Sequence, residues 1–320
     1  MTVKQAYDDF IVFKRSYCDD STVKYYSQNL GFFFDFLRHD YKLDIDSISL
    51  DQLDRKVMQH YVSYLRSRQK YMVHPFKVAD QKKGNLKNST IRIYLRAVRV
   101  FLNYAVDELD SSLSVSRKVK LPKDDTAIQI PLYTHEVNQI DDLFSQSTEL
   151  GLRNLCIIHL MLDAGFRAEE VVSFKVKDIS FDKGILSVID SKNHKSRVVP
   201  LGWQLRMYLQ AYLDFRSPVS DDEFLILKMG SRYGIGYNVI KQLFYRIRSR
   251  TGIARLHPHL LRHTFAVSYL IGGGNLEFLR DMLGHSDYAV TRHYVRVANQ
   301  YRMMGADIYK IDPVFYVSQK

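Results

Sequence analysis

The sequence predicts a mostly helical protein of two domains, with one small antiparallel β-sheet in the second domain. Three observations lead to this fold class. Apolar residues recur at three- and four-residue spacing along most of the chain, which is typical of amphipathic helices. Two short runs rich in β-branched residues lie close together near its middle. A polar segment with little periodicity, residues 109–131, separates two regularly patterned stretches and is interpreted as an interdomain linker.

Residues 1–108 are expected to form an all-helical domain. Apolar spacing predicts helices over residues 3–15, 21–38, 50–68 and 88–106. The second helix is expected to begin at Ser21 or Thr22, since a hydroxyl side chain there would accept a backbone N–H of the first turn.

The fourth predicted helix carries three arginines on the face opposite its apolar stripe. Arg92, Arg96 and Arg99 stand at i, i+4 and i+7, so they share one side of the helix. A solvated charged face explains such a pattern. The more specific alternative is a helix face that binds the phosphates of a nucleic acid.

Residues 132–320 are expected to form the second domain. Its first helices are predicted over 134–144 and 151–164, followed by a hairpin of two strands, 184–189 and 196–201. Further helices are predicted over residues 204–215, 238–250, 259–271 and 275–283, with a short one over 287–294. A tail from about residue 300 to 320 is expected to pack on its own domain or on a neighbouring protomer.

Composition favours a protein that binds a polyanion. The 320 residues include 46 Lys and Arg against 35 Asp and Glu, a formal net charge of +11. Charge alone does not separate DNA from RNA or from a membrane surface. The two cysteines are too few for a disulfide framework, and no apolar run approaches a membrane span. We therefore expect a soluble cytoplasmic protein without a membrane partner.

The segment Gly165-Phe166-Arg167 places an arginine at a helix junction. Gly165 follows an apolar helical run and suits its C-terminal turn, and a new helix is expected near Ala168 with Glu170 in its first turn. This would hold Arg167 in place, although an ordinary surface arginine also fits this stretch alone.

The segment LHPHLLRHTF indicates an anion site. Pro258 suits the first position of a helix, which places His259 and Arg262 one turn apart near its positive end. An imidazole, a guanidinium and backbone N–H groups would together bind a phosphate. A metal site at His257, His259 and His263 competes weakly, because no carboxylate or cysteine completes the set and Arg262 would repel a cation.

The segment LGHSDYAVTRHY contains a third group of candidates. Gly284 can end one helix, His285 then lies in the turn, and Tyr294 follows nine residues later. A lone tyrosine is usually a packing residue, so Tyr294 gains interest only from its position after LGH.

Together these segments resemble the signature of the tyrosine recombinases, or phage-type integrases. That signature is an arginine after a glycine turn, a lysine in a β-hairpin, H-x-x-R, a histidine or tryptophan, and a nucleophilic tyrosine. The matching residues here are Arg167, Lys192 in SKNHKSRVVPL, His259 and Arg262 in HLLRH, His285 and Tyr294. Lys192 matches least well, since its hairpin lacks the usual glycines and Lys195 stands nearby. The helical first domain resembles the core-binding domain of the same family.

The resemblance implies a site-specific recombinase that cleaves and rejoins DNA through a 3′-phosphotyrosyl intermediate, without metal, cofactor or ATP. Tyr294 would be the nucleophile and Lys192 would protonate the leaving 5′-oxygen. Arg167, Arg262 and His285 would contact the phosphate, and His259 would act as general acid and base for the nucleophile. Glu170 would contact these residues and not the substrate. Arg92, Arg96, Arg99 and Lys195 are the candidates for DNA binding.

The resemblance also implies partners. These are double-stranded DNA with an inverted-repeat recognition site, three further copies in a homo-tetrameric synapse, and an accessory protein that sets direction, all associated with the nucleoid. Integration, excision and dimer resolution stay open. Three competing functions also stay open: a type IB topoisomerase, which would use similar residues, a catalytically silent DNA-binding protein, and an RNA-binding protein.

Overall fold

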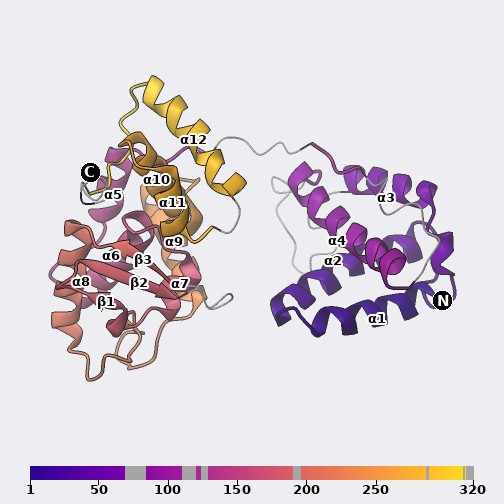
Figure 1. Ribbon diagram of the computed structural model, residues 1–320, viewed down its shortest axis with the longest axis horizontal. Helices are drawn as coiled ribbons and strands as arrows, with labels where there is room; N and C mark the ends of the chain where they lie inside the picture. Colours follow the sequence, from indigo (N-terminus) through magenta and orange to yellow (C-terminus); the bar gives the residue numbers. More distant parts are fainter. Residues whose placement is uncertain are drawn as a thin grey trace. The chain divides into compact units, whose positions relative to one another are not determined.

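The computed structural model describes residues 1–68, 84–109, 120–123, 129–189, 196–285, 288–312 and 314. They belong to two compact units, Met1–Ala127 and Ile128–Lys320 (Figure 1). Both are built mainly from helices, and the second contains a three-stranded antiparallel sheet, which confirms the predicted fold class. Most of the predicted linker lies outside the described residues. No helix of the described part is long and apolar enough to cross a bilayer.

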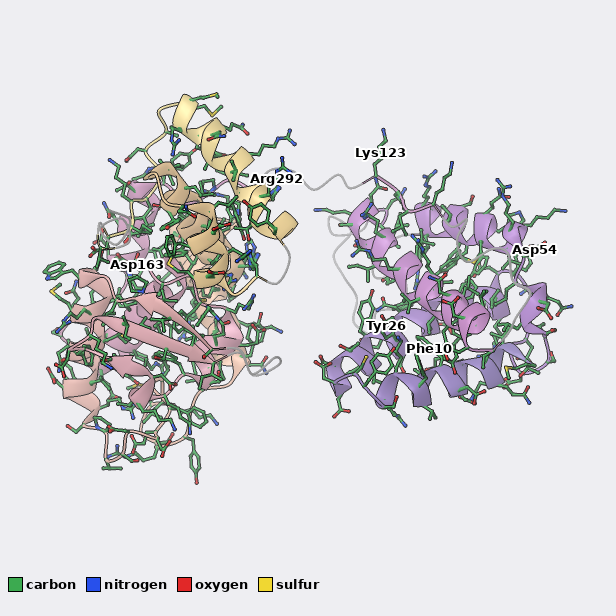
Figure 2. All side chains as sticks on the ribbon, viewed as in Figure 1. Phe10, Tyr26, Asp54, Lys123, Asp163 and Arg292 are labelled. Atoms are coloured by element: carbon green, nitrogen blue, oxygen red, sulfur yellow. The ribbon has the colours of Figure 1, made fainter. Side chains whose placement is uncertain are left out.

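The first unit is a bundle around an aromatic core. Its helices are α1 (Val3–Arg15), α2 (Asp20–His39), the 3₁₀ turn η1 (Leu50–Gln52), α3 (Arg55–Ser67) and α4 (Asn88–Asp107). Phe10 of α1 meets Tyr26 of α2 edge-on, with ring centroids 5.4 Å apart (Figure 2). Phe10 also meets Phe101 of α4 edge-on, with ring centroids 5.6 Å apart. Offset and edge-on aromatic packing of this kind holds the helices together.

Two predicted helix starts in this unit were wrong. α2 begins one residue earlier, because the Asp19 carboxylate accepts the Thr22 N–H at 2.7 Å and so caps the helix in place of Ser21 or Thr22. The helix predicted over 50–68 is divided into η1 and α3, because Asp54 caps α3 by accepting the Val57 N–H at 2.9 Å.

The second unit is organised around helix α6, which is buried almost along its whole length. Its elements are α5 (Thr134–Asp141), α6 (Glu149–Leu162), α7 (Ala168–Ser173), η4 (Val176–Asp178), β1 (Ile179–Ser180), β2 (Ile185–Ile189), β3 (Ser196–Pro200), α8 (Trp203–Arg216), α9 (Tyr237–Thr251), α10 (Pro258–Ile271), α11 (Leu276–Leu283) and α12 (Tyr288–Met303). Helices α8 and α10 pack on α6. Helix α12 extends nine residues beyond the predicted end at Tyr294, since its apolar spacing continues through Val297, Ala298 and Tyr301.

The sheet has the order β1-β2-β3 with antiparallel pairs. Strands β2 and β3 form the predicted hairpin, in which Ile185 pairs with Pro200 and Ile189 with Ser196. Strand β1 was not predicted, because two residues are too short to show any period. The hairpin loop with Lys192 and Lys195 lies outside the described residues.

The segment after α12 packs on its own unit as far as Asp312. Ile308 forms an antiparallel bridge with Tyr133, and Ile311 donates its N–H to the Ser268 hydroxyl at 3.1 Å. The Asp312 carboxylate accepts the Trp203 N–H at 2.6 Å, at the start of α8. The described part of the tail therefore docks in cis.

Candidate active site

The turn between α6 and α7 fixes the position of Arg167. Gly165 has a φ of +67°, a left-handed conformation, and a Cβ there would lie 2.7 Å from the Phe265 ring, so glycine is required twice over. Arg167 then begins α7 as its N-cap residue, and its backbone N–H donates to Glu170 at 2.7 Å.

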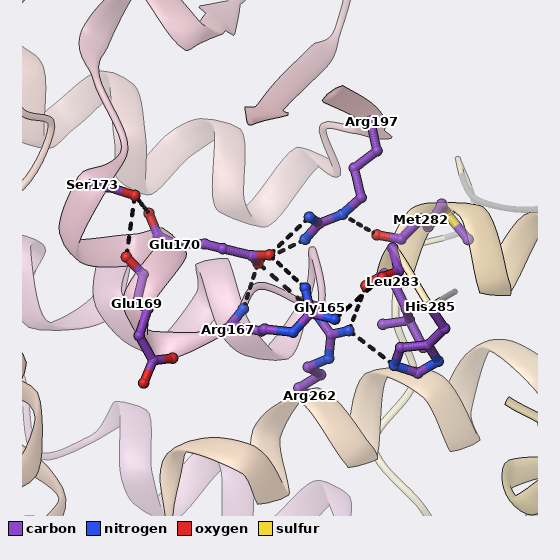
Figure 3. Close-up of polar contacts among 11 residues, drawn as sticks. Gly165, Arg167, Glu169, Glu170, Ser173, Arg197, Arg262, Met282, Leu283 and His285 are labelled. Carbon is purple, nitrogen blue, oxygen red and sulfur yellow. Dashed lines mark hydrogen bonds and ion pairs between the residues drawn. The ribbon is translucent and has the colours of Figure 1, made fainter. Parts of the chain in front are cut away.

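A single buried carboxylate, Glu170, is surrounded by three guanidinium groups (Figure 3). Arg167 Nη1 lies 2.8 Å from Glu170 Oε1, Arg197 Nη2 lies 2.7 Å from Oε2, and Arg262 Nη1 lies 3.9 Å from Oε2. Burial acts to raise the pKa of Glu170, but the hydrogen bonds from Arg197 and Arg167 outweigh it and lower that pKa. The four charges sum to two positive charges, so the cluster is electrostatically incomplete.

Arg197 is a member of this cluster that was missed from the sequence. It lies on β3, donates two hydrogen bonds to Glu170 at 2.8 and 2.7 Å, and donates from Nε to the Met282 carbonyl at 2.6 Å. Its side chain is only 8% exposed. Arg197 belongs to the hairpin segment SKNHKSRVVPL that the sequence analysis singled out for Lys192, but its burial depends on how β3 packs against α7 and α11.

Arg262 on α10 is the most deeply buried of the three arginines. Its Nη1 donates to the Gly165 carbonyl at 2.6 Å and its Nη2 to the Leu283 carbonyl at 2.5 Å. Burial and the neighbouring charge of Arg167 lower the pKa of Arg262 to about 9, which still leaves it charged at neutral pH. Within the described part of the chain, its Nε has no hydrogen-bond partner.

His285 follows α11 and lies between α10 and α12. Arg262 Nη2 stands 3.1 Å from His285 Nε2, and the Thr291 hydroxyl stands 3.0 Å from Nδ1. Because a guanidinium can only donate, Nε2 is the acceptor and the ring proton belongs on Nδ1. Burial and the charges of Arg262 and Arg167 lower the pKa of His285 to about 4, so the ring is neutral at pH 7.

Tyr294 lies beside this cluster in the same chain. It is 5% exposed, and its ring packs near His263 and almost parallel to His285, with centroids 5.4 and 6.2 Å away. Burial raises the pKa of Tyr294, and the charges of Arg262 and Arg167 act against that rise. The phenol is therefore protonated at neutral pH and needs a base before it can act as a nucleophile.

His259 lies at the start of α10, where part of its side chain is exposed and part is covered by the surrounding chain. Desolvation by the surrounding chain and the charges of Arg262 and His257 lower the pKa of His259, so it is neutral near pH 7 and able to accept a proton. The other two histidines of the competing metal site bond to protein groups: His263 to the Gln129 carbonyl at 2.8 Å and His257 to the Arg255 carbonyl at 2.7 Å. Among the residues described, no cluster of three potential metal ligands occurs.

The remaining candidates are not part of this cluster as described. Lys192 and Lys195 lie outside the described residues. Arg92, Arg96 and Arg99 lie on α4 of the first unit. Arg92 donates to the Pro122 carbonyl at 2.6 Å, whereas Arg96 is exposed and Arg99 half-buried.

Comparisons with known proteins cover nearly the whole chain. The model of the phage integrase family matches residues 132–301, and that of the phage integrase SAM-like domain matches residues 5–113. The tyrosine recombinase XerC of Staphylococcus haemolyticus is 27% identical over 272 residues, which are 83% of this chain and 84% of that protein. XerC of Staphylococcus aureus is 26% identical over 301 residues, 93% of each chain.

Solved structures share the fold. The Tn1549 transposon integrase in complex with a circular intermediate DNA superposes with a TM-score of 0.70 at 18% identity, covering 95% of this chain and 99% of that one. A lambda integrase dimer bound to a COC′ core site gives 0.68 at 16% identity, covering 92% and 95%.

Proposed function

The chain belongs to the phage integrase family and is a site-specific tyrosine recombinase, and we propose that Tyr294 is the residue that joins covalently to the DNA. The observation that carries this assignment is the unbalanced arginine cluster beside a buried tyrosine. Glu170 offsets one of the three guanidinium charges, so two positive charges remain to bind a phosphate diester and the further negative charge that develops on it during cleavage. The Nε of Arg262, which has no hydrogen-bond partner in the described chain, is a further donor for such an anion.

Cleavage would proceed by attack of the Tyr294 oxygen on phosphorus. The phenol proton would pass to His259, whose lowered pKa keeps it neutral and ready to accept. The pentacoordinate transition state places more negative charge on the non-bridging oxygens, where Arg167 and Arg262 would donate paired N–H groups. The new bond is a 3′-phosphotyrosyl ester, and the bond that breaks is the one to the 5′-oxygen.

The leaving 5′-oxygen needs a proton, and Lys192 is our candidate donor on the sequence pattern of its hairpin. His285 accepts from Arg262 in the DNA-free protein. It would donate to a phosphate oxygen only after its proton has moved to Nε2. Because the phosphotyrosyl ester retains the energy of the broken bond, a 5′-hydroxyl from another strand would reverse the reaction without ATP or a cofactor.

DNA is the substrate, and two basic surfaces are candidates to bind the backbone of a double-stranded site. On the first unit these are the exposed parts of the α4 arginines. On the second unit, α9 has no acidic residue over Tyr237–Thr251 and exposes Lys241, Tyr245, Arg246 and Arg250. Since α9 packs on α10, the helix of His259 and Arg262, a DNA backbone bound to α9 would lie near that cluster.

Neutralising the α4 arginines is expected to weaken DNA binding and its dependence on salt. The double variant Arg96→Gln/Arg99→Gln should lower the slope of log affinity against log salt by roughly one for each phosphate that the protein no longer neutralises. Arg92 is left intact because its bond to Pro122 would mix a structural effect into the result. The matched control is Arg55→Gln/Lys56→Gln on α3. If the salt slope of the α4 double variant equals that of the α3 control, the α4 arginines do not bind phosphates and form an ordinary solvated face.

The assembly is proposed from the same family relationship. Four copies would form a synapse on two inverted-repeat sites, with an accessory protein setting the direction of the reaction. An enzyme that acts on DNA would work where the DNA lies, in the cytoplasm at the nucleoid.

A plasmid assay tests recombination as distinct from strand cleavage alone. The recognition site is first selected from random-sequence DNA by binding to the Tyr294→Phe variant. A supercoiled plasmid with two directly repeated copies should yield two smaller circles without ATP, whereas a single-site plasmid should not. Relaxation of the single-site plasmid without any resolution of the two-site plasmid would favour a topoisomerase.

A further inference from the structure

The buried hydroxyl of Thr291 links helix α12 to the arginine cluster by way of His285. Thr291 is fully buried, and its Oγ1 stands 3.0 Å from His285 Nδ1. On its other side the same imidazole accepts from Arg262 Nη2 at 3.1 Å (Figure 3). A continuous chain of hydrogen bonds therefore runs from Arg262 on α10, through His285, to Thr291 on α12.

Thr291 also stands in a fixed relation to the nucleophile. Residues three apart lie on the same face of a helix, so Thr291 and Tyr294 share one face of α12, about one turn apart. The ring planes of His285 and Tyr294 differ by only 10°. Any rotation of the imidazole, or any shift of α12 along α10, would change the hydrogen bond and the ring packing together.

We infer that Thr291 is a positioning residue, which holds His285 by Nδ1 and thereby aligns the Tyr294 helix with Arg262. The inference rests on the proposed role of Tyr294 as nucleophile. The hydroxyl suits this task because it both accepts and donates. It accepts from Nδ1–H in the DNA-free protein, and it would donate to Nδ1 once Nε2 carries the proton toward a phosphate.

The Thr291 hydroxyl can be removed with little change of shape. Thr291→Val replaces it by a methyl group and leaves Nδ1 of a buried imidazole without a partner, whereas Thr291→Ser keeps the hydroxyl and loses the methyl group. We expect Thr291→Val to slow single-turnover cleavage about 10- to 100-fold. Thr291→Ser should remain within about threefold of wild type, and DNA affinity should be unchanged in both.

A spectroscopic measurement checks the arrangement without any catalysis. The imidazole ¹⁵N resonances of the full-length protein, with His285→Gln used for assignment, should show His285 protonated on Nδ1 at neutral pH in the wild type and in Thr291→Ser. In Thr291→Val the proton should stay on Nδ1, because Arg262 still donates to Nε2, but the Nδ1–H resonance should move upfield as its hydrogen bond to the hydroxyl is lost. A wild-type His285 protonated on Nε2 would overturn the inference, even if Thr291→Val failed to fold.

The kinetic outcomes separate this inference from the proposed function. If the wild type cleaves and Thr291→Val cleaves equally fast, Thr291 does not position the site. If Thr291→Ser is as slow as Thr291→Val, the methyl group and not the hydroxyl is what matters, which also overturns the inference. If the wild type forms no adduct at Tyr294 while the tautomer is as expected, the proposed function fails.

Discussion

Tyr294→Phe is expected to abolish covalent attachment to DNA while leaving DNA binding intact. A nicked substrate, from which the cleaved fragment diffuses away, should trap the wild-type protein as an adduct that survives SDS and is digested by protease. The substitution removes only the phenolic oxygen, and the ring retains its packing near His263 and His285. With no nucleophile the chemical step has no route, so the loss should be complete.

Two other tyrosines serve as controls for this experiment. Tyr288 and Tyr301 lie on the same helix, and Phe substitutions there should leave adduct formation unchanged. An adduct that persists in Tyr294→Phe and disappears in one of these variants would move the nucleophile along α12.

Arg167→Ala is expected to slow cleavage about a hundred- to a thousandfold while changing DNA affinity far less. Removing one fixed donor from a site that stabilises developing charge typically costs about 3 to 4 kcal/mol. The Arg167 side chain is 34% exposed, against 1% for Arg262, so it has open surface to offer a substrate phosphate. Ground-state binding is spread over many other basic groups, so the effect should fall on the chemical step.

Arg167→Lys should recover only part of the rate, because an ammonium keeps the charge but cannot donate as a planar fork to Glu170 and the phosphate together. Single-turnover cleavage and a binding titration give the two quantities, with circular dichroism and thermal unfolding as folding controls. Arg232→Ala is the matched control, since Arg232 is an exposed arginine of the same unit that pairs with Glu223. A wild-type cleavage rate in Arg167→Ala would make Arg167 a structural surface residue.

Most of the helices could be predicted because they show a long apolar period in the sequence. Periodicity does not fix the ends of the helices. Asp19 caps α2 in place of the nearby hydroxyls, and Asp54 begins α3 inside a stretch whose apolar spacing starts at Leu50. Strand β1 left no signal because it has only two residues. Helix α12 was predicted too short because the prediction stopped where the motif ends at Tyr294, although the apolar spacing continues to Tyr301.

The candidate residues could be proposed from motifs, but their contacts could not. The spacing of Arg167 and Arg262 in the sequence says nothing of the carboxylate they share. The contacts of Arg197 and Thr291 depend on tertiary packing. Arg197 reaches Glu170 because β3 packs near α7, and Thr291 reaches His285 because α12 packs near the turn after α11. Burial also changes protonation states. It lowers the pKa of His285 to about 4, whereas an imidazole in water titrates near neutral pH.

Helix α12 is held by hydrogen bonds both before and after Tyr294 in the sequence. Thr291 binds His285 ahead of it, and behind it Arg302 donates to the Leu270 and Ile271 carbonyls at the end of α10. The chain then remains attached through Ile308 and Asp312. A nucleophile already seated before the substrate arrives loses little conformational entropy when DNA binds. If Tyr294 is the nucleophile, discrimination between DNA sequences would have to come from the binding surfaces, because Tyr294, His285 and Arg262 already lie together without DNA.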